Sequence, residues 1–271
     1  MAVYFLKDFN ILMRADKALV ELKIFLTRTK AQQAIKDGIV TYQGQVITKP
    51  GTDISDTAQL SIVGEIMPYV SRGGLKLEKA LHHFQIDLKG KTVLDIGSST
   101  GGFSDCALQH GAKHIIAIDT GTNQMDSQLR QDKRISLFEQ TDFRSFPIEK
   151  MSKAQVAVID ISFLSVTKIL KKLASLQNIQ EVICLIKPQF ECGKEIADKY
   201  KGVVLNQQVH IDILNNLILA FQQNGFFIQG LTFSPITGGS GNIEYLAYFS
   251  HQAQRPFNIE QKVQQAFQKL K

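Results

Sequence analysis

From Lys91 onward, short runs of almost uninterrupted apolar residues alternate with stretches of helical spacing. The runs span residues 92–96, 114–119, 156–160 and 182–186, with helical stretches such as 102–110 and 166–176 between them. Continuous apolar runs are typical of parallel strands buried on both faces, and their alternation with helices is typical of a doubly wound α/β sheet. Two further strand candidates, 225–233 and 242–249, follow each other without a helix, so we expect one antiparallel strand. The fold class is therefore α/β, Rossmann-like, with a mostly parallel sheet.

A smaller α+β unit with a different pattern precedes this domain. Residues 15–25 carry apolar side chains at helical spacing, and Thr27 or Thr29 can cap a second helix that stops at Gly38. The spacing of apolar residues then changes, and residues 39–42, 46–47 and 60–63 are predicted to form short strands. Between Arg14 and Lys36, six basic residues accompany two acidic ones. Such a concentration of positive charge is expected of a face that binds phosphate, although a solvated helix face explains the charge equally well.

Composition excludes several classes of protein. With 44% hydrophobic and 21% charged residues, the 271-residue chain can bury a core, which excludes a disordered tail, a fibre and a disulfide miniprotein. Its three cysteines lack C-x-x-C spacing, so we expect a reducing compartment and no metal site. The longest apolar run, Met1–Leu6, is too short to cross a bilayer and follows no basic signal region. The sequence thus predicts a cytoplasmic protein without a membrane partner, and it says nothing about oligomeric state.

A glycine-rich loop joins the first strand of the large domain to its first helix. Glycines there allow a ligand to approach the backbone and the polar start of a helix. Asp119 ends the next strand, where a carboxylate can accept both hydroxyls of a ribose. The loop reads G-x-x-x-G-G, unlike the dinucleotide fingerprint G-x-G-x-x-G, and Asp95 precedes it by two residues. This pattern favours S-adenosylmethionine (SAM), whose cationic part an acid can face, over NAD, and both over a turn that binds no ligand.

The predicted cofactor site consists of this loop and the acids that follow two neighbouring strands. Asp142 comes after the strand candidate 135–139 and is expected at the adenine end, although an exposed loop acid is an equally good interpretation. The predicted cofactor-binding residues are Asp95, Gly97, Ser98, Ser99, Thr100, Gly101, Gly102, Phe103, Asp119 and Asp142.

Four ionisable residues occupy positions from which they can activate a hydroxyl group. Asp160 and Lys187 each end a predicted parallel strand, so both should face the crevice that holds the glycine loop. Lys76 enters a helix after Ser71-Arg-Gly-Gly-Leu, and Glu244 lies among apolar residues of the last strand. A lysine that has lost its proton can serve as a general base, held by a neighbouring carboxylate. Each residue alone is an ordinary surface charge, but together they form a credible catalytic set with Lys187 as the base.

These motifs, in this order, resemble those of the TlyA family. The segments that carry the resemblance are Arg14-Ala-Asp-Lys-Ala-Leu, Thr27-Arg-Thr-Lys-Ala-Gln, Gly38-Ile-Val, Lys49-Pro-Gly, Ser71-Arg-Gly-Gly-Leu-Lys-Leu, Asp95-Ile-Gly-Ser-Ser-Thr-Gly-Gly-Phe, Asp160-Ile-Ser-Phe, Lys187-Pro-Gln-Phe-Glu and Gly241-Asn-Ile-Glu-Tyr. Members of that family are called both hemolysins and rRNA 2′-O-methyltransferases; they join an S4-type RNA-binding domain to an FtsJ-like methyltransferase domain. The resemblance covers residues 12–250.

The resemblance implies a function and a set of site residues. It implies SAM as cofactor, ribosomal RNA or a ribosomal subunit as partner, and a Lys-Asp-Lys-Glu tetrad at Lys76, Asp160, Lys187 and Glu244. The residues expected to bind RNA are Arg14, Lys17, Arg28, Lys30 and Arg72. The chain departs from the family at Asp142, where relatives often have Asn, and after Cys192, where a glycine-rich continuation is missing.

We expect four segments along the chain. They are an S4-type domain at 12–63, a linker at 64–72, an FtsJ-like methyltransferase domain at 73–252 and a C-terminal helix at 253–271. Residues 1–11 receive no predicted role.

The sequence leaves two functions of other classes open. A membrane-active cytolysin would need an amphipathic segment, for which only residues 257–270 qualify, with a polar face rich in glutamine. A ribosome-binding factor without activity is the second, and the intact tetrad argues against it. Methylation of base amino groups or of pyrimidine C5 is disfavoured, because Asp160-Ile-Ser-Phe contains no proline and no base-activating motif surrounds a cysteine.

Overall fold

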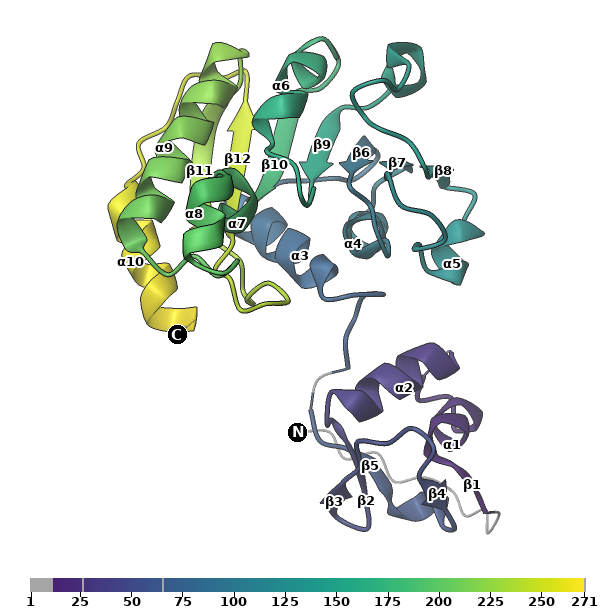
Figure 1. The fold of residues 1–271 in the computed structure, drawn as a ribbon. Helices are drawn as coiled ribbons and strands as arrows, with labels where there is room; N and C mark the ends of the chain where they lie inside the picture. Colours follow the sequence, from purple (N-terminus) through teal and green to yellow (C-terminus); the bar gives the residue numbers. More distant parts are fainter. Residues whose placement is uncertain (1–11, 26, 65, 271) are drawn as a thin grey trace. The chain divides into compact units, whose positions relative to one another are not determined.

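The structure, a computed structural model, describes residues 12–25, 27–64 and 66–270 (Figure 1). The chain divides after Pro68 into two compact units. Residues 1–11, including the whole apolar run at the start of the chain, lie outside the described residues.

The amino-terminal unit packs two helices against short strands. The helices are α1 (Ala15–Glu21) and α2 (Arg28–Lys36); β3 (Gln45–Val46), β2 (Val40–Tyr42) and β5 (Leu60–Ile62) form one sheet, and β1 (Met13–Arg14) pairs with β4 (Asp53–Ile54). The Thr27 hydroxyl accepts a hydrogen bond from the backbone N–H of Lys30 at 3.3 Å and so caps α2. Of the two predicted caps, Thr27 is confirmed. The two-residue strands β1 and β4 are too short to be recognised by an alternating pattern.

The second unit is built on a sheet of seven strands in the order β11-β12-β10-β9-β6-β7-β8. The prediction of a mostly parallel sheet with one antiparallel strand is confirmed, since β12 runs antiparallel to both of its neighbours. The strands are β6 (Thr92–Ile96), β7 (His114–Ile118), β8 (Ile135–Phe138), β9 (Val156–Ile159), β10 (Glu181–Ile186), β11 (Phe227–Phe233) and β12 (Tyr245–Ser250).

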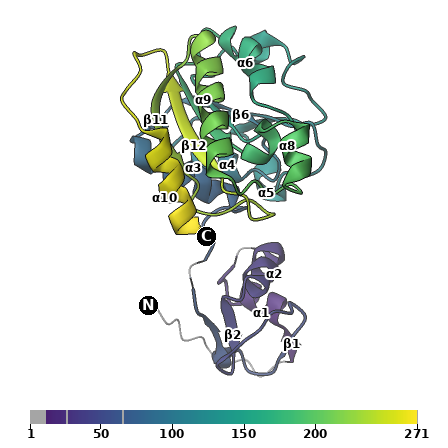
Figure 2. The same cartoon turned by 60° about the vertical axis from the view of Figure 1, so that its left-hand side comes forward.

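Helices cover both faces of this sheet. One apolar cluster joins the sheet to α3 (Gly73–Phe84), α4 (Gly102–Gln109) and α5 (Ser127–Arg130). The other joins it to α6 (Thr167–Ala174), α9 (Gln207–Gln223) and α10 (Ile259–Leu270). Helices α9 and α10 lie side by side in Figure 2 and contact each other. Two short helices, α7 (Pro188–Glu191) and α8 (Lys194–Lys199), follow β10. Turns of 3-10 helix occur at Thr57–Gln59 and Ile148–Met151.

Three boundaries differ from those expected from the sequence. Tyr69 is buried in the core, and the backbone N–H of Val70 donates to Asp105 at 2.8 Å, so packing of the second unit begins inside the segment expected to be a linker. Glu244 lies one residue before β12 rather than within it. Helix α10 begins only at Ile259, after residues 253–258 without regular structure. Within the described residues, none of the helices is both long enough and apolar enough to cross a membrane.

Candidate functional site

The glycine loop follows β6 and turns directly into α4, and its glycines are required by close packing. Gly97 has a φ of +87°, and a Cβ atom there would lie 2.6 Å from the carbonyl oxygen of Asp160. Such an approach is tolerated only without a side chain. Gly102, at the start of α4, would press a Cβ into Ser71 and the start of α3. The loop therefore brings the ends of β6 and β9 and the starts of α3 and α4 together.

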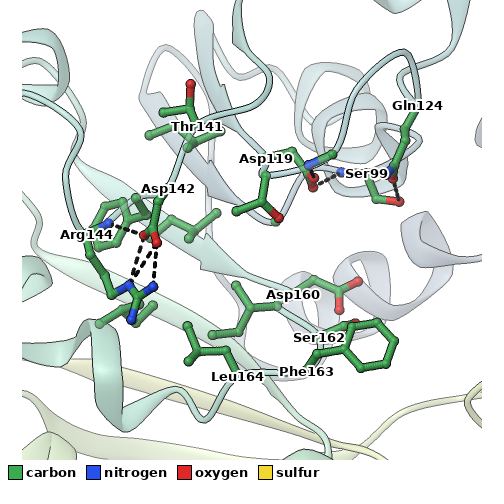
Figure 3. Close-up of a pocket in the computed structure, with 18 residues that line it drawn as sticks. Ser99, Asp119, Gln124, Thr141, Asp142, Arg144, Asp160, Ser162, Phe163 and Leu164 are labelled. Atoms are coloured by element: carbon green, nitrogen blue, oxygen red, sulfur yellow. Dashed lines mark hydrogen bonds and ion pairs between the residues drawn. The ribbon is translucent and has the colours of Figure 1, made fainter.

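Asp119 organises this loop through backbone hydrogen bonds (Figure 3). Its two carboxylate oxygens accept from the N–H of Ser99 at 2.8 Å and of Gly121 at 2.6 Å. Asp119 follows β7, as predicted, and lines the same cavity as Gly97.

Three adjoining cavities open at the carboxyl ends of the strands. The first, of about 580 Å³, is lined by Gly97, Asp119, Asp142 and Asp160, among others. The second, of about 250 Å³, shares Gly97 and Asp160 with it and extends along the glycine loop to Lys76. The third, of about 680 Å³, begins at Lys76 and is lined by the other two members of the tetrad. Ser162 and Phe163 line both the first and the third cavity, and Lys76 lines both the second and the third, so these residues connect the loop side of the cleft to its far side.

Most of the predicted cofactor residues line these cavities. Those that do are Gly97, Ser98, Ser99, Thr100, Gly102, Phe103, Asp119 and Asp142. The Asp142 carboxylate lies at the far end of the first cavity and is paired with Arg144, with an N–O distance of 2.6 Å (Figure 3). Gly101 serves the turn into α4 instead, with a φ of +91° and its α-carbon facing Leu129.

Asp95 occupies a different position from the one expected of a residue that faces a ligand. Its carboxylate is fully buried beneath the loop and lines none of the three cavities. One oxygen accepts from the Ser104 hydroxyl at 2.6 Å, and the other has no hydrogen-bond partner among the described residues. Burial raises the pKa of Asp95 to about 7, and the charges of Asp160 and Asp119 add to the effect. Three carboxylates therefore interact within this part of the cleft.

The tetrad forms two ion pairs in the cleft. Lys187, which follows β10, lies 2.5 Å from Asp160, and Lys76 of α3 lies 2.6 Å from Glu244. Both lysine side chains are only 11% exposed. Lys187 also donates to the Ser162 hydroxyl at 2.8 Å, so an ion pair and a hydrogen bond together hold its Nζ atom. The structure thus brings the four predicted residues together as two lysine–carboxylate pairs.

Several residues of the cleft were not predicted from the sequence. Ser162 could have been found from its place two residues after Asp160 at the end of β9. Phe163 is 90% exposed with a φ of +64°, and its ring centre lies 4.9 Å from that of Phe190. A bulky residue in the left-handed region is uncommon and points to a functional constraint. Other unpredicted lining residues are Gln124, Thr141, Arg144, Ile236, Thr237 and Gln189.

Glu191, at the end of the Lys187-Pro-Gln-Phe-Glu motif, anchors a helix. Its carboxylate accepts from the Ser165 hydroxyl at 2.6 Å and from the backbone N–H of Val166 at 2.9 Å, at the start of α6. Burial raises the pKa of Glu191 above its ordinary value. The cysteines offer no reactive thiolate: Cys106 and Cys184 are fully buried, and burial raises the pKa of all three thiols.

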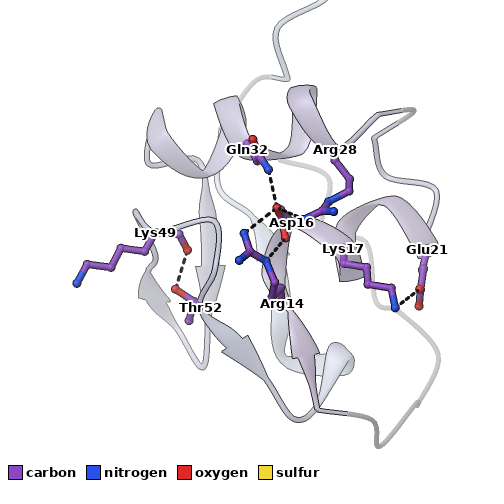
Figure 4. Close-up of polar contacts among 8 residues, drawn as sticks. All are labelled: Arg14, Asp16, Lys17, Glu21, Arg28, Gln32, Lys49 and Thr52. Carbon is purple, nitrogen blue, oxygen red and sulfur yellow. Dashed lines mark hydrogen bonds and ion pairs between the residues drawn. The ribbon is translucent and has the colours of Figure 1, made fainter.

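In the amino-terminal unit, one buried acid holds two of the predicted RNA-binding residues (Figure 4). Asp16 accepts hydrogen bonds from Arg14, from Arg28 at 2.9 Å and from Gln32 at 2.6 Å. The two arginines stay 52% and 55% exposed. These hydrogen bonds, led by that from Arg14, hold the pKa of Asp16 far below its ordinary value.

The other predicted RNA-binding residues are not among the side chains that donate to Asp16. Lys17 forms an exposed pair with Glu21 at 3.5 Å, one turn along α1, and Lys30 lies on α2. Arg72 belongs to the second unit, where it lines the cavity along the glycine loop. It is therefore no part of the basic surface of the amino-terminal unit.

Comparison with known proteins gives consistent matches to both units. The sequence matches the FtsJ-like methyltransferase family over residues 69–251 and the S4 domain family over residues 13–60. It is 46% identical to a putative rRNA methyltransferase, YqxC, of Bacillus subtilis, covering 87% of this chain and 84% of that protein. It is 34% identical to the 16S/23S rRNA (cytidine-2′-O)-methyltransferase TlyA of Mycobacterium tuberculosis, covering 91% and 93%. A solved structure of a putative hemolysin from Streptococcus thermophilus superposes with a TM-score of 0.74 at 38% identity, covering 96% and 98%.

Proposed function

The chain belongs to the TlyA family of FtsJ-like methyltransferases with an S4 domain, and from this premise we propose that it transfers the methyl group of SAM to a ribose 2′-hydroxyl of ribosomal RNA. The observation that carries the proposal is the Lys187–Asp160 pair at 2.5 Å, whose carboxylate also lines the glycine-loop cavities. Lys187 lines the third cavity and contacts the carboxylate that lines the other two, so it can act on a hydroxyl group that is brought next to a cofactor bound at the glycine loop.

The chemistry of the glycine-loop cavity fits SAM better than NAD. Gly97 leaves open the space that a side chain would fill, and Asp119 offers two acceptors at a strand end. The carboxylates of Asp119 and Asp160, which line this cavity, favour a ligand with positive charge over a pyrophosphate, which carries negative charge. SAM supplies a methyl group bound to a positively charged sulfur. We assign Gly97, Ser99 and Asp119 to its binding, and Asp142 to the adenine end.

In this proposal, the residues of the tetrad move and hold one proton. The Nζ atom of Lys187, in its neutral form, accepts the proton of the ribose hydroxyl as the oxygen takes the methyl group. Asp160 and Ser162 hold that Nζ atom, at 2.5 Å and 2.8 Å. Lys76 and Glu244 form the second pair, which gives the far wall of the cleft a fixed geometry. General-base assistance of this kind contributes about 10²- to 10⁴-fold in rate.

Two surfaces support RNA as the substrate. The exposed ring of Phe163, at the border of the first and third cavities, offers an apolar face on which an unstacked base can lie. In the amino-terminal unit, Arg14 and Arg28 present exposed guanidinium groups to phosphates. We propose ribosomal RNA as the substrate class, because two similar proteins are named as a putative rRNA methyltransferase and an rRNA (cytidine-2′-O)-methyltransferase.

The test is product analysis with a defined methyl donor. Purified small and large ribosomal subunits from cells lacking the protein are incubated with methyl-labelled SAM and the enzyme, and the RNA is digested to nucleosides. We expect the label in a 2′-O-methylated nucleoside. Label in a methylated base would refute ribose methylation. No label, with SAM and RNA both bound, would favour the non-catalytic factor, and release of dye from vesicles without label transfer would favour the cytolysin.

A further inference from the structure

Three metal-binding side chains converge where α3 and α4 end, away from the proposed catalytic residues. Glu78 and His82 lie one turn apart on α3, and His110 follows the last residue of α4. One ligand atom from each of the three lies within 4.8 Å of the other two. Residues four apart on a helix share a face, and α3 packs against α4, which explains the convergence. We propose that Glu78, His82 and His110 bind a zinc-class transition-metal dication and thereby join the two helices.

The neighbours of two of these side chains already hold them in the orientation that a ligand needs. Nδ1 of His110 lies 2.9 Å from the backbone carbonyl oxygen of Cys106. A ring N–H donated to that carbonyl leaves Nε2 as the nitrogen with a free lone pair, which is the usual arrangement of a metal-binding histidine. The Glu78 carboxylate accepts from the Tyr69 hydroxyl at 2.8 Å, which fixes one of its oxygens and leaves the other available.

The Tyr69 hydroxyl is a dependable donor to Glu78. Tyr69 is buried in the core, and the only acid that its hydroxyl donates to among the described residues is Glu78. The carboxylate is therefore oriented by a group that does not compete with it for a cation. Hydrogen-bonded partners of this kind typically contribute about 10- to 100-fold to metal affinity.

The donor set decides which metal is expected. Two imidazole nitrogens and one carboxylate oxygen are the protein ligands of many zinc sites with an open fourth position for water. The same donors suit nickel and copper, whereas magnesium and calcium prefer oxygen ligands throughout. Zinc–ligand bonds of about 2.0–2.2 Å require the three atoms to approach one another further. His82 is exposed and can supply that movement by a change of rotamer.

The position of the cluster suggests what the metal does. Helices α3 and α4 meet at their first residues, Gly73 and Gly102, beside the glycine loop, and α3 carries Lys76. A metal bound to Glu78, His82 and His110 fastens the other ends of the same helices. Its expected effect is on the stability of this helix pair, since none of the three ligands lines the catalytic cavities.

The experiment measures metal binding and thermal stability, independently of methyl transfer. Full-length protein without an affinity tag is stripped with a chelator and titrated with ZnCl₂ by calorimetry, and its Tm is recorded with zinc or magnesium. We expect one equivalent of zinc to bind and Tm to rise, because a ligand that binds only the folded state stabilises it. Magnesium should leave Tm unchanged.

Variants show whether the cluster is responsible. His82→Ala and His110→Ala should each weaken zinc binding by at least tenfold, whereas His83→Ala, which changes the neighbouring exposed histidine, should bind as the wild type does. Glu78→Gln keeps an acceptor for Tyr69 and should also weaken zinc binding. It therefore tests the cluster even if one of the histidine variants does not fold. The proposal is overturned if the wild-type protein shows no zinc-dependent rise in Tm, or if zinc binds to the His82→Ala and His110→Ala variants as tightly as to the wild type.

Discussion

The basic residues of the two units are held in different ways. In the amino-terminal unit, Arg14 and Arg28 share the single carboxylate of Asp16 and keep about half of their side-chain surface exposed. In the sheet unit, Lys76 and Lys187 each contact a carboxylate of their own, and their side chains are 11% exposed. Arginine has several donors, so part of each guanidinium group can contact Asp16 while other N–H groups stay available to a phosphate. A lysine amine is a single group that can lose its proton, which suits it to proton transfer.

The buried acids of the two units also differ in how firmly their charge is fixed. Asp16 is surrounded by donors, and they lower its pKa, so it is a fixed negative charge that orients the arginines. Asp95, beneath the glycine loop, has one hydroxyl donor and other carboxylates nearby, and burial raises its pKa to about 7. One unit thus carries a surface with fixed charges, and the other a cleft in which charge can change.

The largest effect is expected from removing the buried lysine next to Asp160. Lys187→Ala should lower the single-turnover rate of methyl transfer by about 10²- to 10⁴-fold, because the proton acceptor is lost. Dissociation constants for SAM and RNA, measured separately, should change little. Lys171→Ala, at an exposed position on α6, is the matched control and should keep the wild-type rate. Equal rates in both variants would remove the catalytic distinction between surface and buried lysines.

The next effect concerns Asp119, which forms no ion pair within the part of the chain that the structure describes. Asp119→Ala should raise the dissociation constant for SAM by about 10- to 100-fold, because hydrogen bonds to a charged group contribute about 1.5–3 kcal/mol. Calorimetric titration provides the measurement, with Glu149→Ala, an exposed acid of the same unit, as control. Native SAM affinity in Asp119→Ala would contradict the assignment of this acid to the ribose.

A smaller effect is expected from neutralising the exposed basic surface. The triple variant Arg14→Gln, Arg28→Gln, Lys30→Gln should weaken RNA binding. The slope of log K against log salt concentration should become shallower by about two to three, since each phosphate contact contributes about 0.7–0.9 to that slope. SAM affinity should stay the same. A control with the same change in charge, Lys133→Gln, Lys153→Gln, Lys171→Gln, alters exposed lysines of the sheet unit. An identical salt dependence in the two triple variants would mean that the arginine pair is only a solvated face.

The smallest expected effect is a pH dependence of stability. Asp95 keeps its proton in the folded state up to about pH 7, whereas in the unfolded chain it loses it near pH 4. The folded state therefore binds more protons between these values, and this contribution to stability falls as pH rises through that range. Without SAM, the Tm of Asp95→Asn minus that of the wild type should increase between pH 5 and pH 8. The increase should be about 2–4 °C for each kcal/mol of stability that the wild type loses over this range. A difference that is constant over this range would show that Asp95 is ionised throughout.

Much of the fold follows from sequence periodicity, because buried strands and capped helices depend on local patterns. Residues 92–96 form β6 as predicted, and the ends of β9 and β10 carry Asp160 and Lys187. The pairing of Lys76 with Glu244 joins residues 168 positions apart, and no local pattern encodes it. The burial of Asp95 could not be predicted for a related reason. An acid next to a glycine loop is typical of a ligand contact, and only the tertiary structure shows that Ser104 packs against it.

The most direct test of the account is the single-turnover rate of Lys187→Arg on one RNA substrate, with SAM and RNA binding measured on the same preparation. Arginine keeps the positive charge next to Asp160 but does not release its proton in proteins, so it cannot accept one. We expect near-native binding and a rate reduced to the level of Lys187→Ala. A Lys187→Arg enzyme that keeps most of the wild-type rate would contradict the account, because the buried lysine would then act as a fixed charge, as the exposed arginines do.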